Sequence, residues 1–437
     1  MALGPSVGGG TAPHLRAAAR AVGAKALTLP VTALAMLVAT RTVVDSLGVS
    51  GYALVALVTT LTAMVPLGDL GAGAAIVDAM ARSRNGDREP LRRAITSGAR
   101  TLVYAGALIA ALGIVPACLG MWSPLLGRAG QPGTDGSVAV AFLLFGCTLP
   151  LNLGKSILIA LNRTHVALVL QGAGSVLALL LLLGAAAAHA SVVAFVASGF
   201  IAQCAVGAFC LALASRLLGM PLLRLIPASV RRCRPGTRIR NLVVPMMVIN
   251  AGSSVAYATD RLVLSHVADP ATVAVYSAGA QLFAPAVGLI SVAGMPLWTL
   301  FAHQRESPDR PTWRDLSRLT VHFAAGGLIA GVGFVALGPT VGSWMMHGQA
   351  QVGAGLMAAF AALLFVQAVN YPASMWLTDA AGLRFQAIRV SIMAVANLAL
   401  SIPLARLVGA PGPVIASVAA FTAVVFVPSL RKALSRA

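Results

Sequence analysis

The sequence predicts an all-α polytopic membrane protein, with about 12 transmembrane helices in two six-helix bundles around a central cavity. Three observations support this fold class. Hydrophobic residues make up 58% of the 437 residues and charged residues only 10%. The basic residues gather in alternate gaps between long apolar segments. The longest basic gap, at residues 216–240, divides the apolar segments into two equal sets.

Each apolar segment is long enough to cross about 30 Å of hydrocarbon at a helical rise of 1.5 Å per residue. The predicted spans are residues 26–44, 52–76, 99–119, 137–160, 166–188, 192–214, 242–264, 273–301, 319–345, 353–377, 385–405 and 413–427.

The orientation follows from the 31 Lys and Arg residues, since loops that stay in the cytoplasm retain positive charge. All but four of them fall on one side of the predicted spans; the exceptions are Arg41, Arg128, Arg261 and Arg406. Both termini are therefore expected in the cytoplasm, and the chain is expected to be a multi-pass protein of the bacterial plasma (inner) membrane.

The domain organisation follows from the same pattern. Residues 1–24 are expected to form a basic cytoplasmic tail, 25–215 the N-terminal six-helix lobe, 216–240 a basic cytoplasmic linker and 241–437 the C-terminal six-helix lobe. The two lobes share a short similarity, because residues 41–52 (RTVVDSLGVSGY) resemble residues 261–276 (RLVLSHVADPATVAVY) when four residues are inserted. Internal repeats of this kind are common in secondary transporters.

The composition also excludes several classes of function. The net charge of +19 is explained by the basic loops and their attraction to anionic membrane lipid, so no nucleic-acid partner is expected. The five cysteines show no metal-binding spacing, and no metal or other cofactor is expected. No Asp-x-Asp, P-loop or nucleophile elbow is present, so a membrane enzyme acting on lipid-linked sugars is the less favoured alternative.

Two stretches carry a resemblance to a known family. Residues 40–82 contain a Leu-Gly turn, the Gly51-Tyr52 pair and a DLG motif at Asp69 to Gly71. Residues 260–304 contain an Asp260-xxx-Leu264 stretch followed by VAVYSAGAQL at 273–282. Together they resemble the paired signatures of the polysaccharide, or O-antigen-type, flippases of the multidrug/oligosaccharidyl-lipid/polysaccharide (MOP) exporter superfamily.

This resemblance implies two lobes around a cavity that opens alternately to each side of the membrane. It implies a substrate that is an oligosaccharide or repeat unit on a polyprenyl diphosphate, moved from the cytoplasmic to the outer leaflet, with polysaccharide-assembly proteins as possible partners. Many relatives have fourteen spans, whereas this chain has twelve. An ion-coupled multidrug efflux transporter of the same superfamily therefore remains the main alternative.

Charged residues inside apolar spans are the first candidates for a site, because an ionisable group in hydrocarbon is expensive unless it is paired or hydrated. Arg41 and Arg261 lie in the outer halves of the first and seventh spans, where a guanidinium facing the cavity would bind diphosphate oxygens. The alternative is that both side chains extend to the outer headgroups. A local pair with Asp45 or Asp260 is also open for these arginines.

The remaining candidates are a carboxylate–lysine pair and two amides. Asp69 and Lys155 lie at similar depth near the cytoplasmic ends of their spans, where they would either stabilise the lobe or form an inner gate. Asp69 and Asp260 are also candidates for coupling transport to an ion. Asn250 and Gln281 lie nearest the middle of the membrane in the second lobe and are candidate sugar contacts, although such amides also join helices to one another.

The predicted topology is tested by labelling Cys233, which lies in the basic linker. In intact cells, a membrane-impermeant thiol reagent should leave Cys233 unmodified in a variant that keeps only this cysteine, whereas a permeant reagent should label it. Ready labelling by the impermeant reagent would reverse the orientation.

Overall fold

The computed structural model describes residues 11–64, 76, 79–80, 89–127, 130–161, 163–220, 222, 240–306 and 313–435. The longer elements of its first half are helices α1 (Thr11–Ala63), α3 (Glu89–Cys118), α4 (Trp122–Leu125), α5 (Thr134–Leu151), α6 (Leu153–Ala160), α7 (Thr164–Ala187) and α8 (Val192–Leu218). Those of the second half are α10 (Arg240–Val267), α11 (Pro270–Glu306), α12 (Trp313–Met345), α13 (Ala354–Trp376), α14 (Ala380–Val408), α15 (Pro411–Ala420), the π-helical turn η3 (Phe421–Phe426) and α16 (Val427–Leu434).

The helices confirm the predicted fold class. Within the described residues, 10 helices are long and apolar enough to cross a membrane. One of them, in α1, contains both the first predicted span and the start of the second, because the two are continuous apart from a kink at Gly48 (φ 72°, ψ 177°). A positive φ is accessible to glycine without steric cost, so Gly48 lets the chain change direction without a loop. Helix α10 covers the predicted seventh span and completes the set of 12.

Two predicted spans are less regular than expected. The fourth is divided at Asn152, where α5 ends and α6 begins, two residues after Pro150. Proline lacks the N–H that would bond to the carbonyl four residues before it, so Pro150 weakens the turn that precedes it and does not by itself explain the division that follows it. The twelfth contains the π-helical turn between α15 and α16 and continues to Leu434, beyond its predicted end at residue 427.

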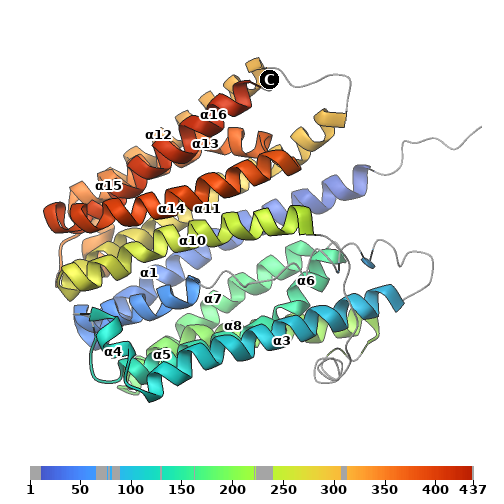
Figure 1. The fold of residues 1–437 in the computed structure, drawn as a ribbon. Coiled ribbons are helices and arrows are strands. Elements are labelled where there is room, and N and C mark those ends of the chain that lie inside the picture. Colours follow the sequence, from blue (N-terminus) through green and yellow to red (C-terminus); the bar gives the residue numbers. More distant parts are fainter. Residues whose placement is uncertain are drawn as a thin grey trace, which may run out of the picture.

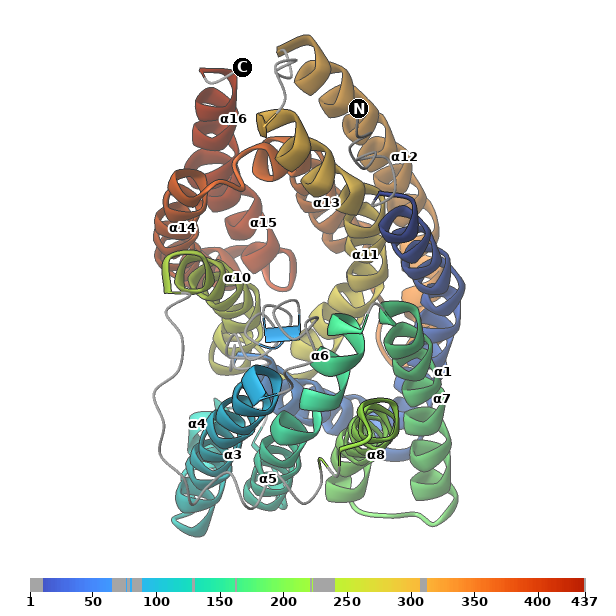
Figure 2. The same ribbon diagram turned by 90° about the vertical axis from the view of Figure 1, so that its right-hand side faces the viewer.

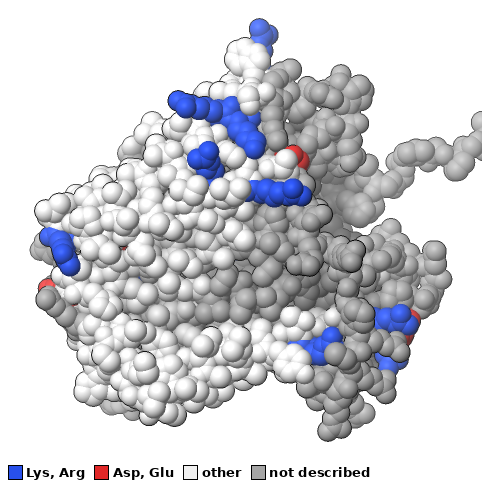
Figure 3. All heavy atoms as spheres, viewed as in Figure 1, with Lys and Arg blue, Asp and Glu red and all other residues white. Residues whose placement is uncertain are grey.

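The helices run back and forth between two ends of the molecule (Figure 1). We call the end that carries the Gly48 kink, the short helix α4 and the turns at residues 188–191, 346–353 and 409–410 the Gly48 end. The opposite end, where the N-terminal part of α1 and the last residues of α16 lie, is the basic end. On the face shown in Figure 3, most of the visible Lys and Arg side chains gather toward the basic end. The Gly48 end is the one predicted to face outward.

Most helix packing lies within each half of the chain. In the first half α3 packs on α5, and α8 packs on α5 and α7, whereas in the second half α13 packs on α11 and α12, and α14 packs on α10 and α15. Helix α1 joins the two sets, because it packs on α7 and also on α10, α11 and α12. Figure 2 shows the two sets in the lower and upper parts of the view, with α1 beside α7, α11 and α12. The exact domain boundaries remain a prediction, since most of the linker lies outside the described residues.

Glycines allow the closest helix contacts. A Cβ added at Gly154 on α6 would lie 2.3 Å from the backbone nitrogen of Leu211 on α8, and one added at Gly106 would lie 2.3 Å from the carbonyl oxygen of Gly146. These distances are shorter than any real carbon contact, so the helices meet backbone to backbone. Small residues serve this purpose in membrane helices, where packing rather than the hydrophobic effect holds helices together.

We therefore expect Gly154→Ala to lower the thermal unfolding midpoint in detergent by several degrees, because overpacking at a rigid backbone contact costs about 1–3 kcal/mol. The matched control is Gly184→Ala on α7, where an added Cβ meets nothing within 4 Å. That variant should unfold at or slightly above the parental midpoint. Equal midpoints for the two variants would contradict this packing.

Candidate functional site

Side chains at the Gly48 end connect the two halves of the chain. Thr40 on α1 donates a hydrogen bond from its hydroxyl to the side-chain oxygen of Gln281 on α11. Arg261 on α10 donates from Nη1 to the Thr60 hydroxyl at 2.5 Å and approaches the carbonyl oxygen of Ala56 at 3.5 Å. Both acceptors lie on the part of α1 that follows the Gly48 kink. Because of the kink, polar groups from both parts of α1 contact the second half: Thr40 before the kink and Thr60 after it.

Arg41 crosses the interface in the other direction. Its Nη1 lies 3.5 Å from the carbonyl oxygen of Trp344 on α12, and its guanidinium carbon lies 4.7 Å from the centroid of the Trp344 ring. On its own helix, Arg41 Nε is 3.9 Å from a carboxylate oxygen of Asp45. The Asp45 carboxylate also contacts Nδ1 of His347, in the turn after α12, at 2.6 Å.

The two predicted arginines therefore share one arrangement. Each is half-buried, and each reaches from its own half to a helix of the other half. Arg41 has the local pair with Asp45 that the sequence left open. Arg261 has no such pair with Asp260, because within the described residues no ion pair joins them and the guanidinium turns to Thr60. The structure thus brings Arg261 and Gln281 to one interface, and their role toward a substrate stays a prediction.

Asp260 is the centre of a second polar cluster, inside the second half. Its side chain is only 1% exposed. It accepts hydrogen bonds from the Tyr276 hydroxyl on α11 at 3.1 Å, from Asn397 Nδ2 at 3.1 Å and from Ser401 Oγ at 3.0 Å on α14, and from Ser417 Oγ on α15 at 3.2 Å. Sequence reasoning singled out Asp260 but did not find this set of donors.

The chemistry of this cluster follows from its partners. Every donor is neutral, and no Lys, Arg or His nitrogen within the described residues lies within 4.0 Å of Asp260. Burial opposes a bare negative charge, whereas four donors stabilise one. A carboxylate in this position suits a proton or a small cation as its counter-charge. The cluster joins α10 to three other helices through one ionisable group, so its charge state is tied to the packing of these four helices.

The matching positions of the first half lack the carboxylate at the centre of this cluster. When residues 41–52 are matched to 261–276, Tyr52 corresponds to Tyr276 and Thr40 stands where the second half has Asp260. Tyr52 is 1% exposed, and its hydroxyl has no hydrogen-bond partner among the described residues. The first half therefore lacks the carboxylate that organises the second, and its Thr40 bonds across the interface instead.

The remaining predicted residues are not brought together with these clusters. Asn250 is exposed on α10, and Lys155 is half-buried on α6. Asp69, the proposed partner of Lys155, lies outside the described residues. The pairing of Asp69 with Lys155 and its role as an inner gate therefore stay predictions.

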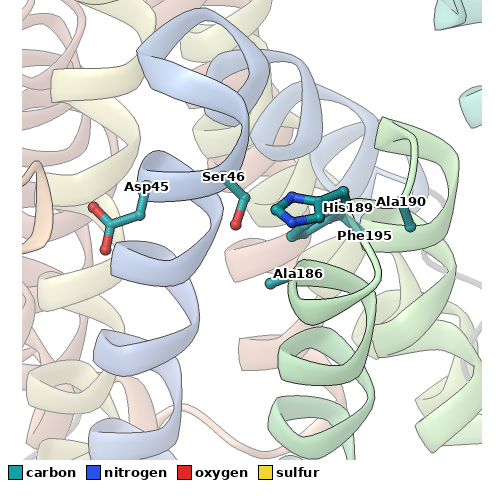
Figure 4. A pocket seen from close by; sticks show the side chains of 6 residues that line it. All are labelled: Asp45, Ser46, Ala186, His189, Ala190 and Phe195. Atoms are coloured by element: carbon teal, nitrogen blue, oxygen red, sulfur yellow. The ribbon is translucent and has the colours of Figure 1, made fainter.

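A small cavity of about 280 Å³ lies beside the end of the first part of α1. It is lined by Asp45, Ser46, Ala186, His189, Ala190 and Phe195. Figure 4 shows that Ser46 points toward His189, which ends α7, whereas the Asp45 carboxylate points away from it on the other side of α1. Ser46 thus faces His189 of the first half, whereas Asp45 contacts His347 of the second half.

Comparison with known proteins identifies solved structures of similar fold. No family model and no curated protein sequence matches the chain. Solved structures do, over nearly the whole length. An inward-facing multidrug resistance MATE family transporter of the MOP superfamily matches with a TM-score of 0.69, 15% identity and coverage of 94% of this chain and 98% of that one. The chain has the fold of the MOP-superfamily transporters.

Two further structures inform the comparison. The lipid II flippase MurJ, in an inward closed conformation, matches with a TM-score of 0.68 and 13% identity, covering 94% of this chain and 87% of that one. The outward-facing conformation of a multidrug resistance MATE family transporter of the same superfamily matches with a TM-score of 0.61 and 14% identity, covering 96% of this chain and 95% of that one. The fold is shared by a flippase and by multidrug resistance transporters, so the fold leaves the substrate open.

The Asp260 cluster predicts a clear difference between neighbouring substitutions. Asp260→Ala should lower the thermal unfolding midpoint, because it leaves buried hydroxyl and amide donors without their acceptor at about 1–3 kcal/mol for each group left unpaired. Thr259→Ala is the matched control, since the Thr259 hydroxyl bonds only within its own helix, to the Ala256 carbonyl. A parental midpoint for Asp260→Ala would show that the cluster does not hold α10, α11, α14 and α15 together.

Proposed function

We propose that this protein is an alternating-access transporter, rather than an enzyme, that moves a polyprenyl-diphosphate-linked oligosaccharide or polysaccharide repeat unit from the cytoplasmic to the outer leaflet. The observation that carries the proposal is the pair of arginines at the interface of the two halves, each bonded to the opposite half. The fold shared with MOP-superfamily transporters and the signatures at residues 40–82 and 260–304 support it.

The arginines give the interface the chemistry of a diphosphate site. A guanidinium binds phosphate oxygens through two parallel hydrogen bonds, and these are stronger than bonds to neutral acceptors. In the present arrangement Arg41 contacts a carbonyl oxygen, an aromatic ring and, at 3.9 Å, the Asp45 carboxylate, whereas Arg261 contacts a hydroxyl and a carbonyl oxygen. Apart from Asp45, these are weak partners for a cation within a membrane. A diphosphate at the interface would replace them with charged acceptors and so loosen the contact between the halves.

The same contacts define the conformational state in this proposal. The cross-half bonds lie toward the Gly48 end, which is predicted to face outward, so closure there corresponds to an inward-facing transporter. The higher TM-score with the inward-facing than with the outward-facing MATE family structure supports this assignment. Opening the Gly48 end requires Arg261 to leave Thr60 and Arg41 to leave Trp344.

The Asp260 cluster is proposed to couple this change to an ion. The sequence contains no P-loop, so ATP hydrolysis on this chain is not the energy source. Asp260 is joined to α11, α14 and α15 and is adjacent in sequence to Arg261, which holds the cross-half contact. Binding or release of a proton or small cation at Asp260 would therefore alter packing directly behind that contact.

A multidrug efflux transporter is the second candidate. It is favoured by the resemblance of the fold to a multidrug resistance MATE family transporter, which spans 98% of that protein. Two arginines at the interface favour an anionic substrate over a cationic drug, because a desolvated cation beside a guanidinium is repelled. The two candidates are separated by the charge of the substrate that is transported.

The flippase proposal predicts that Arg41→Ala and Arg261→Ala each slow translocation of a lipid-linked oligosaccharide about tenfold or more. Losing a hydrogen bond to a charged group costs about 1.5–3 kcal/mol, and about 1.4 kcal/mol corresponds to a factor of ten. Arg→Lys at either position should give a partial defect, since lysine keeps the charge but not the planar fork. The measurement is translocation in vesicles reconstituted at matched protein levels.

The matched control is Arg406→Ala, which removes an exposed arginine from the last turn of α14 at the same end of the molecule. That variant should transport at the parental rate. Parental rates for both Arg41→Ala and Arg261→Ala would remove the diphosphate role. Efflux of cationic drugs without translocation of the lipid-linked oligosaccharide would favour the second candidate.

A further inference from the structure

The end of α12 carries a strained histidine directly opposite α1. His347 has a φ of 50°, a backbone conformation that glycine adopts readily and histidine does not. Its N–H donates to the Trp344 carbonyl at 3.3 Å, and the N–H of Gly348 donates to the Ser343 carbonyl at 3.2 Å. This is a helix-ending turn whose left-handed position usually holds glycine.

The strain has an identifiable use. A non-glycine residue in this region is disfavoured and persists where the surrounding structure holds it there. Here the turn directs the imidazole of His347 across the interface, with Nδ1 2.6 Å from Oδ1 of Asp45. Glycine would form the turn without strain but would leave Asp45 without this partner. His189 has a similar backbone conformation, so it is the contact with Asp45 that points to a role for the His347 side chain.

The groups around this contact are all identifiable within the described residues. On α1 the other oxygen of Asp45 is 3.9 Å from Arg41, and Arg41 in turn lies over the Trp344 ring. His189, at the end of α7, lines the cavity on the far side of α1 and does not point at Asp45 (Figure 4). His347 is therefore the imidazole that faces Asp45, and imidazole is the side-chain group that ordinarily gains or loses a proton near neutral pH, whereas arginine stays charged.

We propose that His347 and Asp45 form a proton-sensitive clasp that holds the two halves of the protein together at the Gly48 end. When His347 is protonated, a charge-assisted hydrogen bond joins it to the Asp45 carboxylate. When it is neutral, the attraction between opposite charges is lost, and the Gly48 end opens more readily. The consequence for transport rests on the proposed alternating-access function: acid on the side of the Gly48 end favours the state closed there.

The size of the effect is limited by exposure. The side chains of His347 and Asp45 are 51% and 39% exposed, so solvent screens the pair. Ion pairs of this kind contribute up to about 1 kcal/mol, which corresponds to a change in the ratio of closed to open molecules of about two- to fivefold. A change of this size shifts a balanced equilibrium without locking the protein in one state.

The test measures the distance across the Gly48 end by spin labels at Ser191→Cys and Gln349→Cys, two exposed positions on opposite halves. The full-length protein, with its natural cysteines replaced, is placed in lipid nanodiscs without substrate. Between pH 5 and 8, the ratio of short to long distances should fall about two- to fivefold in the parent. His347→Asn and Asp45→Asn should each remove this pH dependence, and His347→Lys should keep the short distance at both pH values.

His189→Asn is the matched control, because His189 also ends a helix at this end with a positive φ, of 47°, but does not contact Asp45. Asparagine tolerates the left-handed conformation, so neither asparagine variant should unfold for that reason. A parent distance that does not change with pH, or a change that persists in His347→Asn, overturns the clasp. No substrate is present in this measurement, so its result does not depend on the flippase function. The flippase proposal is tested separately, by the translocation assay.

Discussion

The placement of positive charge within hydrocarbon is the constraint on which the rest of the structure depends. A guanidinium inside a membrane requires partners. In this protein Arg41 and Arg261 both take partners from the opposite half of the chain, and Arg41 also pairs with Asp45 on its own helix. The contacts that satisfy these two charges therefore also hold the two bundles together. Any anion that satisfies them better competes with that contact. Substrate binding and conformational change are linked, in this account, through the same pair of side chains.

The two halves differ in how their interior polar groups are hydrogen-bonded. In the second half the carboxylate of Asp260 collects donors from α11, α14 and α15 and is almost completely buried. In the first half the matching position is Thr40, which bonds to Gln281 across the interface. One half thus has an internal ionisable group, and the other supplies contacts that change when the halves separate.

The sequence predicted the fold because hydropathy and the distribution of basic residues report directly on membrane crossing. It also identified Arg41, Arg261, Gln281 and Asp260, because an ionisable or amide group in an apolar span is conspicuous. The partners were not predicted. Thr40 and Gln281 are 241 positions apart, and Arg41 and Trp344 are 303 apart, so their contacts depend on how the helices pack. No periodicity within one span contains that information.

Smaller features were missed for local reasons. Ser401 and Ser417 look like ordinary small residues in apolar helices, and only the position of Asp260 makes them donors. His347 lies in a turn that carries the helix-ending Gly348, and its left-handed backbone cannot be read from composition. The division of the fourth span at Asn152 was not predicted, because Pro150 weakens the turn before it rather than the turn after it, and a proline within a membrane helix is often tolerated.

The two ends of the molecule are expected to open alternately. This is tested by measuring the distance between the two halves at both ends during transport. Single-molecule energy transfer would use one dye pair at Ser191 and Gln349 for the Gly48 end and another at Arg163 and Ser435 for the basic end, all exposed positions. In reconstituted vesicles, adding lipid-linked oligosaccharide should lengthen the distance at the Gly48 end. Under the same conditions it should shorten the distance at the basic end. A Gly48 distance that stays constant while substrate is translocated would contradict the account.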